Sequence, residues 1–313
     1  MNNYRVRLIN EWAARGFKFF EDTVWTSSLQ KADLPKIRGF LTTSDFNNVH
    51  ASILIPQNDN TFRIKWVRYY QASGQCVSRG HPVPIPAGSN HLKLTFCYDS
   101  AETRERRRNQ TVVVANALRL VFGVPVAREL ILVSRFSEEE IEAGISSDVG
   151  YASPFDTQLL NMFESPPIDG AELIPFPEEA AILLDKAFAQ TFPNERFILM
   201  WLAFEAIMHS HPGKAENGKK REKFFREELK SDIVNKEVFR LFQVRNSAFK
   251  EGRFSHPHFD EECWSLYVAL QLALMKDCPQ RYAFLSGYEN TLKQQARQRN
   301  EANSPAAPSS TIT

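Results

Sequence analysis

Residues 196–208 read RFILMWLAFEAIM, and this stretch decides the fold of the C-terminal part of the chain. Its large apolar residues follow one another at intervals of four, three and four, and they are Phe197, Trp201, Phe204 and Met208. This spacing gathers side chains on one face of an α-helix. The flanking segments, including residues 235–250 and 260–284, also have a helical period. We therefore predict an all-α bundle of four to five helices over residues 177–288.

The first half of the chain has the period of a β-sheet. Phe62, Ile64 and Trp66 alternate with charged residues, and the same alternation recurs over residues 92–98. Shorter apolar runs at 51–55 and 129–133 also suit strands, and one helix is expected over 103–122. The proline-rich stretch 81–89 is expected to lie outside the sheet. We predict an α+β recognition domain over residues 1–164, in a family that the sequence does not identify.

Two further segments differ in composition from these domains. Residues 165–176 contain the run SPPIDG and Pro175, and Pro177 follows directly, which is typical of a linker between domains. Residues 289–313 are polar and end in a Ser-, Pro- and Ala-rich stretch with little to bury. We expect this tail to be disordered.

Composition and charge exclude several classes of protein. The 313 residues carry 38 basic and 37 acidic side chains, so the net charge of +1 excludes a globally basic nucleic-acid binder. The sequence has neither a secretory signal nor an apolar run long enough to cross a bilayer, which predicts a cytoplasmic protein without a membrane partner. The four cysteines are far apart and no phosphate-binding loop is present, so we expect neither a metal nor a cofactor.

A charged residue interrupts the apolar face of the helix expected at 235–250. Arg245 lies seven residues after Val238 and four after Leu241, so it shares their face. Glu205 lies four residues after Trp201 and also points into the bundle. Because an unpaired buried charge is strongly unfavourable, the two side chains are expected to form an ion pair that fixes the register of the helices. The alternative is that Arg245 faces a phosphate in a cleft.

These segments resemble the HEPN superfamily (higher eukaryotes and prokaryotes nucleotide-binding), in particular its Apea-like branch. The aromatic-rich helix at 196–206 has an inward Glu205, a basic segment follows it, and Arg245–Asn246 stand where the family has its Arg and adjacent polar residue. Glu251–Gly252 then close the helix. The likeness covers residues 177–285, and the chain is more loosely similar to bacterial proteins labelled methylamine-utilisation protein J.

The resemblance implies a function but also a departure from it. Active members are metal-independent RNases in which a His near the Arg acts as acid or base and the Arg stabilises the phosphate. Here Lys250 stands where the family has this His, and a protonated lysine can hold a phosphate but not accept a proton. The motif Arg245, Asn246, Lys250 is therefore degenerate, which favours a binding or accessory protein.

Two alternatives and several partners stay open at this point. The chain could be a working endoribonuclease of a stress or antiviral system, completed by Lys250 or by the loop histidines His256 and His258. It could also be a purely structural accessory protein. The resemblance implies a homodimer through the motif helix, and RNA, a nucleotide or a protein as further partner.

A basic segment between the two key helices is the second candidate binding region. It contains Lys219, Lys220, Arg221 and Lys223, which we predict either to contact phosphate or to form a solvated helix face. His209 and His211 precede it and are expected to be solvated.

Overall fold

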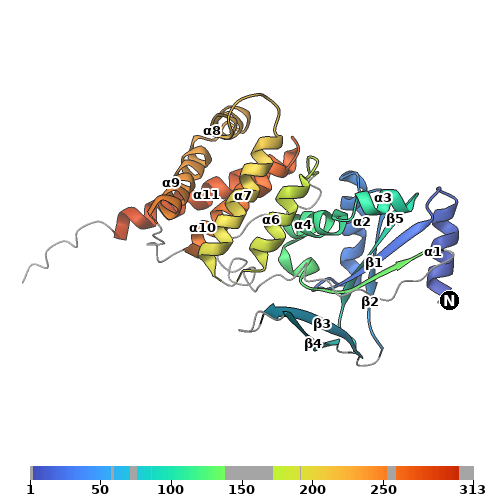
Figure 1. Cartoon of the computed structure of the whole chain (residues 1–313). Helices are drawn as coiled ribbons and strands as arrows, with labels where there is room; N and C mark the ends of the chain where they lie inside the picture. Colours follow the sequence, from blue (N-terminus) through green and yellow to red (C-terminus); the bar gives the residue numbers. More distant parts are fainter. Residues whose placement is uncertain are drawn as a thin grey trace, which may run out of the picture.

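The computed structural model describes residues 3–57, 60–70, 76–85, 87–137, 172–190, 192–251 and 259–302. A small sheet forms one end of the molecule and a group of helices forms the other (Figure 1). This agrees with an α+β part followed by a helical part. No helix within the described ranges combines the length and the hydrophobicity that crossing a bilayer requires.

Four antiparallel strands form the main sheet in the order β2-β5-β1-β6. Their bounds are β1 (Phe19–Thr26), β2 (Val49–Leu54), β5 (His91–Tyr98) and β6 (Leu130–Phe136). The strands expected at 51–55, 92–98 and 129–133 are confirmed, whereas β1, the strand between β5 and β6, was not predicted. Its acidic residues Glu21 and Asp22 interrupt the apolar pattern in the sequence. Both are buried in the structure, where Glu21 accepts from Arg135 and Asp22 accepts from Thr95.

A separate two-stranded ribbon consists of β3 (Asn60–Tyr70) and β4 (Cys76–Ile85). Because β4 includes Pro82 and Pro84, the expectation that residues 81–89 stay outside any sheet was wrong. Each strand of a two-stranded ribbon has one edge without a partner, and a proline costs no ladder hydrogen bond on that edge.

Four helices belong to the sheet end of the described chain: α1 (Asn3–Ala13), α2 (Leu34–Thr43), α3 (Ala101–Arg106) and α4 (Gln110–Phe122). Two short 3₁₀ turns, η1 (Lys31–Asp33) and η2 (Val124–Ala127), accompany them. The single helix expected over 103–122 is divided between α3 and α4. Residues 107–109 break it, and α4 then starts as a nearly all-apolar helix whose residues 114–118 are all fully buried.

The helical part contains α6 (Glu178–Phe188), α7 (Pro193–Ser210), α8 (Asn217–Glu222), the π-helical turn η3 (Lys223–Glu228), α9 (Asp232–Glu251), α10 (Phe259–Leu274) and α11 (Pro279–Ala302). The predicted stripe on α7 is confirmed, because Phe197, Trp201, Phe204 and Met208 are all fully buried.

The end of the chain differs from the prediction. One helix was expected over 260–284, but residues 275–278 separate α10 from α11, which begins at Pro279. A proline suits the first turn of a helix and not its interior. The disordered tail predicted from residue 289 is helical as far as Ala302. Tyr288 and Leu292 explain this difference, because both are buried and hold the helix against the bundle.

The predicted linker, residues 165–176, lies only partly within the described residues. Residues 172–174 lie against the bundle, where Leu173 forms a β-bridge with Met275, and residues 165–171 lie outside the described residues. One continuous hydrophobic core extends from the sheet through α4 into the bundle. The core is therefore shared between the part of the chain before the predicted linker and the part after it.

An ion pair lies at the contact of α4 with α6, the helix next to it in Figure 1. Arg119 Nη1 donates to Asp185 Oδ1 at 2.9 Å, and the two side chains are 0% and 3% exposed. Arg119 Nε donates to the carbonyl of Ala127, and the guanidinium lies over the rings of Trp25 and Phe188. Arg119 of α4 therefore contacts strand β1 through Trp25, and helix α6 of the bundle through Asp185 and Phe188.

Candidate functional site

Arg245 lies in the C-terminal half of α9 and is half-buried. Its Nη1 donates to Asn246 Oδ1 at 2.9 Å, and its guanidinium lies 4.6 Å from the centre of the Phe249 ring. The Nε atom is buried and has no hydrogen-bond partner among the described residues. Arg245, which is only half-buried, therefore has one hydrogen-bond donor without an acceptor among the described residues.

The ion pair predicted between Glu205 and Arg245 is not formed. Glu205 accepts instead from Arg221 Nη1 and from Asn217 Nδ2, the latter at 2.6 Å. Both donors belong to α8, which follows α7 after a short connection and therefore returns beside the end of α7. Helical periodicity correctly placed Glu205 inward, but it does not determine which of two arginines reaches it.

Arg221 connects these groups. Its guanidinium lies 5.4 Å from the ring centre of Trp201 and 5.0 Å from that of Phe242. Burial lowers the pKa of Arg221, Glu205 opposes this shift, and the positive charge of Arg245 lowers the pKa further. The positive charge of Arg245 therefore acts on Arg221, whose guanidinium is bonded to the carboxylate of Glu205.

Trp201 provides a second unsatisfied donor at this place. Its side chain is fully buried, and its indole Nε1 has no hydrogen-bond partner among the described residues. A buried indole N–H usually finds an acceptor. The sequence marked Trp201 only as a core residue, and no sequence signal distinguished it from its neighbours on the stripe.

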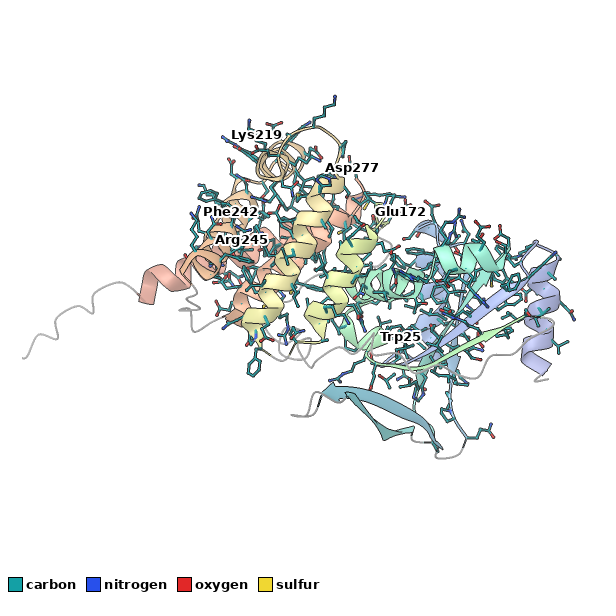
Figure 2. The ribbon with its side chains drawn as sticks, in the orientation of Figure 1. Trp25, Glu172, Lys219, Phe242, Arg245 and Asp277 are labelled. Carbon is teal, nitrogen blue, oxygen red and sulfur yellow. The ribbon has the colours of Figure 1, made fainter. Side chains whose placement is uncertain are left out.

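A groove of about 560 Å³ opens next to Arg221, between α8 and the N-terminal half of α9. It is lined by Gly218, Arg221, Glu222, Asn235, Lys236, Val238, Phe239 and Phe242. Figure 2 shows Phe242 and Arg245 on neighbouring turns of α9, with Lys219 on α8. The groove adjoins the arginine pair through Arg221 and through Phe242, on which Arg221 stacks.

The four basic residues predicted as one binding patch have different environments. Lys220 is buried, and its Nζ donates to the carbonyl oxygens of His209 and His211 at 2.8 and 2.7 Å. Arg221 is engaged by Glu205, while Lys219 and Lys223 are exposed. A single patch of four cations is therefore not present, because Lys220 stabilises the end of α7 instead.

The remaining motif residues lie near the end of α9. Lys250 is exposed, and its neighbour Phe249 is 51% exposed although it is a large aromatic residue. The helix turns Ala248 inward at this point, so Phe249 and Lys250 face solvent. Both residues are thus available on the surface next to Arg245.

The structure describes two of the four histidines named in the sequence analysis. His209 is exposed as expected, whereas His211 is half-buried, with Nε2 3.0 Å from the carbonyl of Ala273 and its ring against Phe224. His256 and His258 lie outside the described residues. Within the described part of the chain, no group of three or more His, Cys, Asp or Glu side chains is arranged to hold a metal ion.

Comparisons with protein-family models, with curated proteins and with solved structures found no match to this chain.

Proposed function

We propose that this chain is a HEPN-like binding or accessory protein that holds an anionic partner at Arg245 and Asn246 without cleaving it. The single observation that carries the proposal is the state of Arg245. Its guanidinium is half-buried beside a second guanidinium, retains a buried donor without a partner, and is not bonded by a carboxylate among the described side chains. Such a group fits an oxygen anion.

Cleavage of RNA would require a group that accepts a proton from the 2′-hydroxyl. Glu205, the carboxylate next to the arginine pair, is already bonded to Arg221 and Asn217. Lys250, at the position of the family's histidine, is exposed and points to solvent at the end of α9. These two observations support binding without proton transfer.

The same helix supports a homodimer as part of the proposal. Phe249 is 51% exposed on the last turns of α9, next to Arg245 and Lys250. A large exposed aromatic residue beside polar groups is typical of interface cores. A second copy seated on these turns would bring two motif helices together. RNA, a nucleotide or a protein would then be the further partner.

Cleavage of RNA tests the proposal directly. Purified protein is incubated with 5′-labelled single-stranded RNA in the presence of EDTA, and the products are separated on a denaturing gel. We expect intact RNA with the wild-type chain, and retarded but uncut RNA in a gel-shift assay if RNA is the partner. Cleavage that is lost in Arg245→Ala, with an unchanged circular dichroism spectrum, would instead establish the endoribonuclease alternative.

A gain-of-function variant tests the same site by adding the missing group instead of removing one. Lys250→His places an imidazole at the family's position, and new cleavage by this variant would mean that the other parts of the centre are intact. Lys223→His, which changes another exposed lysine, is the matched control and is expected to leave RNA uncut.

A further inference from the structure

The groove between α8 and α9 has two chemically different sides. Val238, Phe239 and Phe242 form an apolar wall on α9, and Phe239 is 61% exposed although it is a large aromatic residue. Lys236 and Arg221 contribute positive charge to the remaining lining. Pockets of a few hundred Å³ with apolar walls and a few polar groups are the usual shape of small-molecule sites.

The charges around the groove are not balanced. Among the lining residues two cations, Arg221 and Lys236, face the single carboxylate of Glu222. The carboxylate of Glu205 offsets Arg221, but Arg245 lies close enough to Arg221 for their charges to interact. The described residues therefore leave an excess of positive charge beside an apolar wall.

Arg221 is the cation of the groove with the most constrained environment. Its guanidinium stacks on the rings of Trp201 and Phe242, and the positive charge of Arg245 acts on it. An anion placed against Arg221 in the groove would offset this positive charge.

We infer that this groove binds a small organic anion, with one phosphate or carboxylate group held by Arg221 and Lys236 and an aromatic body packed on Phe239. One aromatic ring fits easily within about 560 Å³. The inference goes beyond the proposed function, because it involves the N-terminal half of α9 and not the turns that carry Phe249 and Lys250. It also does not depend on whether RNA is bound or cut.

Calorimetric titration with three probes tests the inference on the full chain. Phenyl phosphate and benzoate have a ring and an anionic group, whereas phenol has the same ring without the charge. We expect at least one of the two anions to bind at least tenfold more tightly than phenol, and the better anion identifies the head group. Equal binding of phenol, or no heat with either anion up to about 5 mM, would overturn the inference.

Substitutions at exposed positions locate the bound probe. Phe239→Ser removes the ring from the apolar wall and Lys236→Gln removes a charge, and each is expected to weaken binding of the anion at least about tenfold. The matched controls are Phe192→Ser and Lys186→Gln, which alter an exposed phenylalanine and an exposed lysine outside the groove. Binding that is lost equally in the controls, or retained in Phe239→Ser and Lys236→Gln, would place the probe elsewhere and refute the site.

The two proposals fail separately. If phenyl phosphate and benzoate do not bind but RNA is retained through Arg245, the groove inference is wrong and the proposed function stands. If the wild-type chain cleaves RNA while Phe239→Ser loses the anion, the proposed function is wrong and the groove inference stands.

Discussion

Asp185→Ala is expected to destabilise the entire chain, because it leaves the guanidinium of Arg119 charged in a place that water does not reach. The two charges are 2.9 Å apart, and Arg119 is 0% exposed. At an effective dielectric constant of about 20, their direct attraction amounts to about 6 kcal/mol. Arg119 keeps its bonds to the carbonyl of Ala127 and to Asn116 Oδ1, which offset part of the loss. Removing one partner of a buried pair typically costs about 3–5 kcal/mol, and we expect a loss in this range.

Urea denaturation followed by circular dichroism gives the free energy of unfolding. For a chain of this length the expected loss corresponds to a fall in Tm of about 5–8 °C, since the unfolding entropy is about 2.1 cal/mol/K per residue. Lys186→Ala alters the exposed neighbour of Asp185 and is expected to change stability by less than about 0.5 kcal/mol. Asp185→Asn keeps an acceptor for Arg119 and provides a milder variant if the alanine variant does not fold.

Two results would refute this reasoning. One is a loss below about 1 kcal/mol for Asp185→Ala, which would mean that Arg119 tolerates an unpaired state. The other comes from hydrogen exchange measured separately on β1 and α7. Because the pair connects both parts of the core, protection of both elements should fall together, and a change confined to α7 would contradict the described coupling.

Two further predictions concern the bundle. Glu205→Ala should lower the free energy of unfolding by about 1–3 kcal/mol, because Arg221 and Asn217 lose their acceptor, whereas Arg245→Ala should cost less than about 1 kcal/mol. Equal losses in urea denaturation would support the originally predicted pair of Glu205 with Arg245. Burial lowers the pKa of His211 below its ordinary value of 6.5, so the unfolded chain binds the proton more readily than the folded one. The contribution of His211 to stability is therefore complete above about pH 6.5 and decreases as the pH falls below it, and His211→Phe should reduce the slope of stability against pH between about 5 and 6.5. A slope that is the same in the variant and the wild type would contradict this assignment.

The helical part could be predicted from sequence to a large extent, because its information is local. The stripe on α7 depends only on intervals of three and four residues, and all four of its members are buried as expected. Strand β1 could not be predicted in this way. Glu21 and Asp22 look like surface residues in the sequence, and they are buried because Arg135, Thr111 and Thr95 satisfy them across the fold.

For the candidate site, the sequence predicted which face of a helix each residue occupies, but not which residues of different helices meet. Periodicity placed Glu205 and Arg245 toward the interior, and both are at least partly buried. It did not predict that Arg221 lies between them, because α8 is short and basic and looks like a solvated segment. Lys220 was misjudged for the same reason. A lysine that bonds two carbonyl groups at a helix end has no pattern in the sequence that distinguishes it from a solvated one.

The contact of α4 with the late helices has a consequence for synthesis on the ribosome. Tyr267 and Gln271 of α10 donate to the carbonyl oxygens of Arg119 and Leu120 on α4. Translation completes α10 about 150 residues after α4, which at about 5–20 residues per second means a delay of roughly 8–30 s. During this delay the side of α4 that α10 covers stays open, so the nascent N-terminal part exposes apolar surface until α10 emerges.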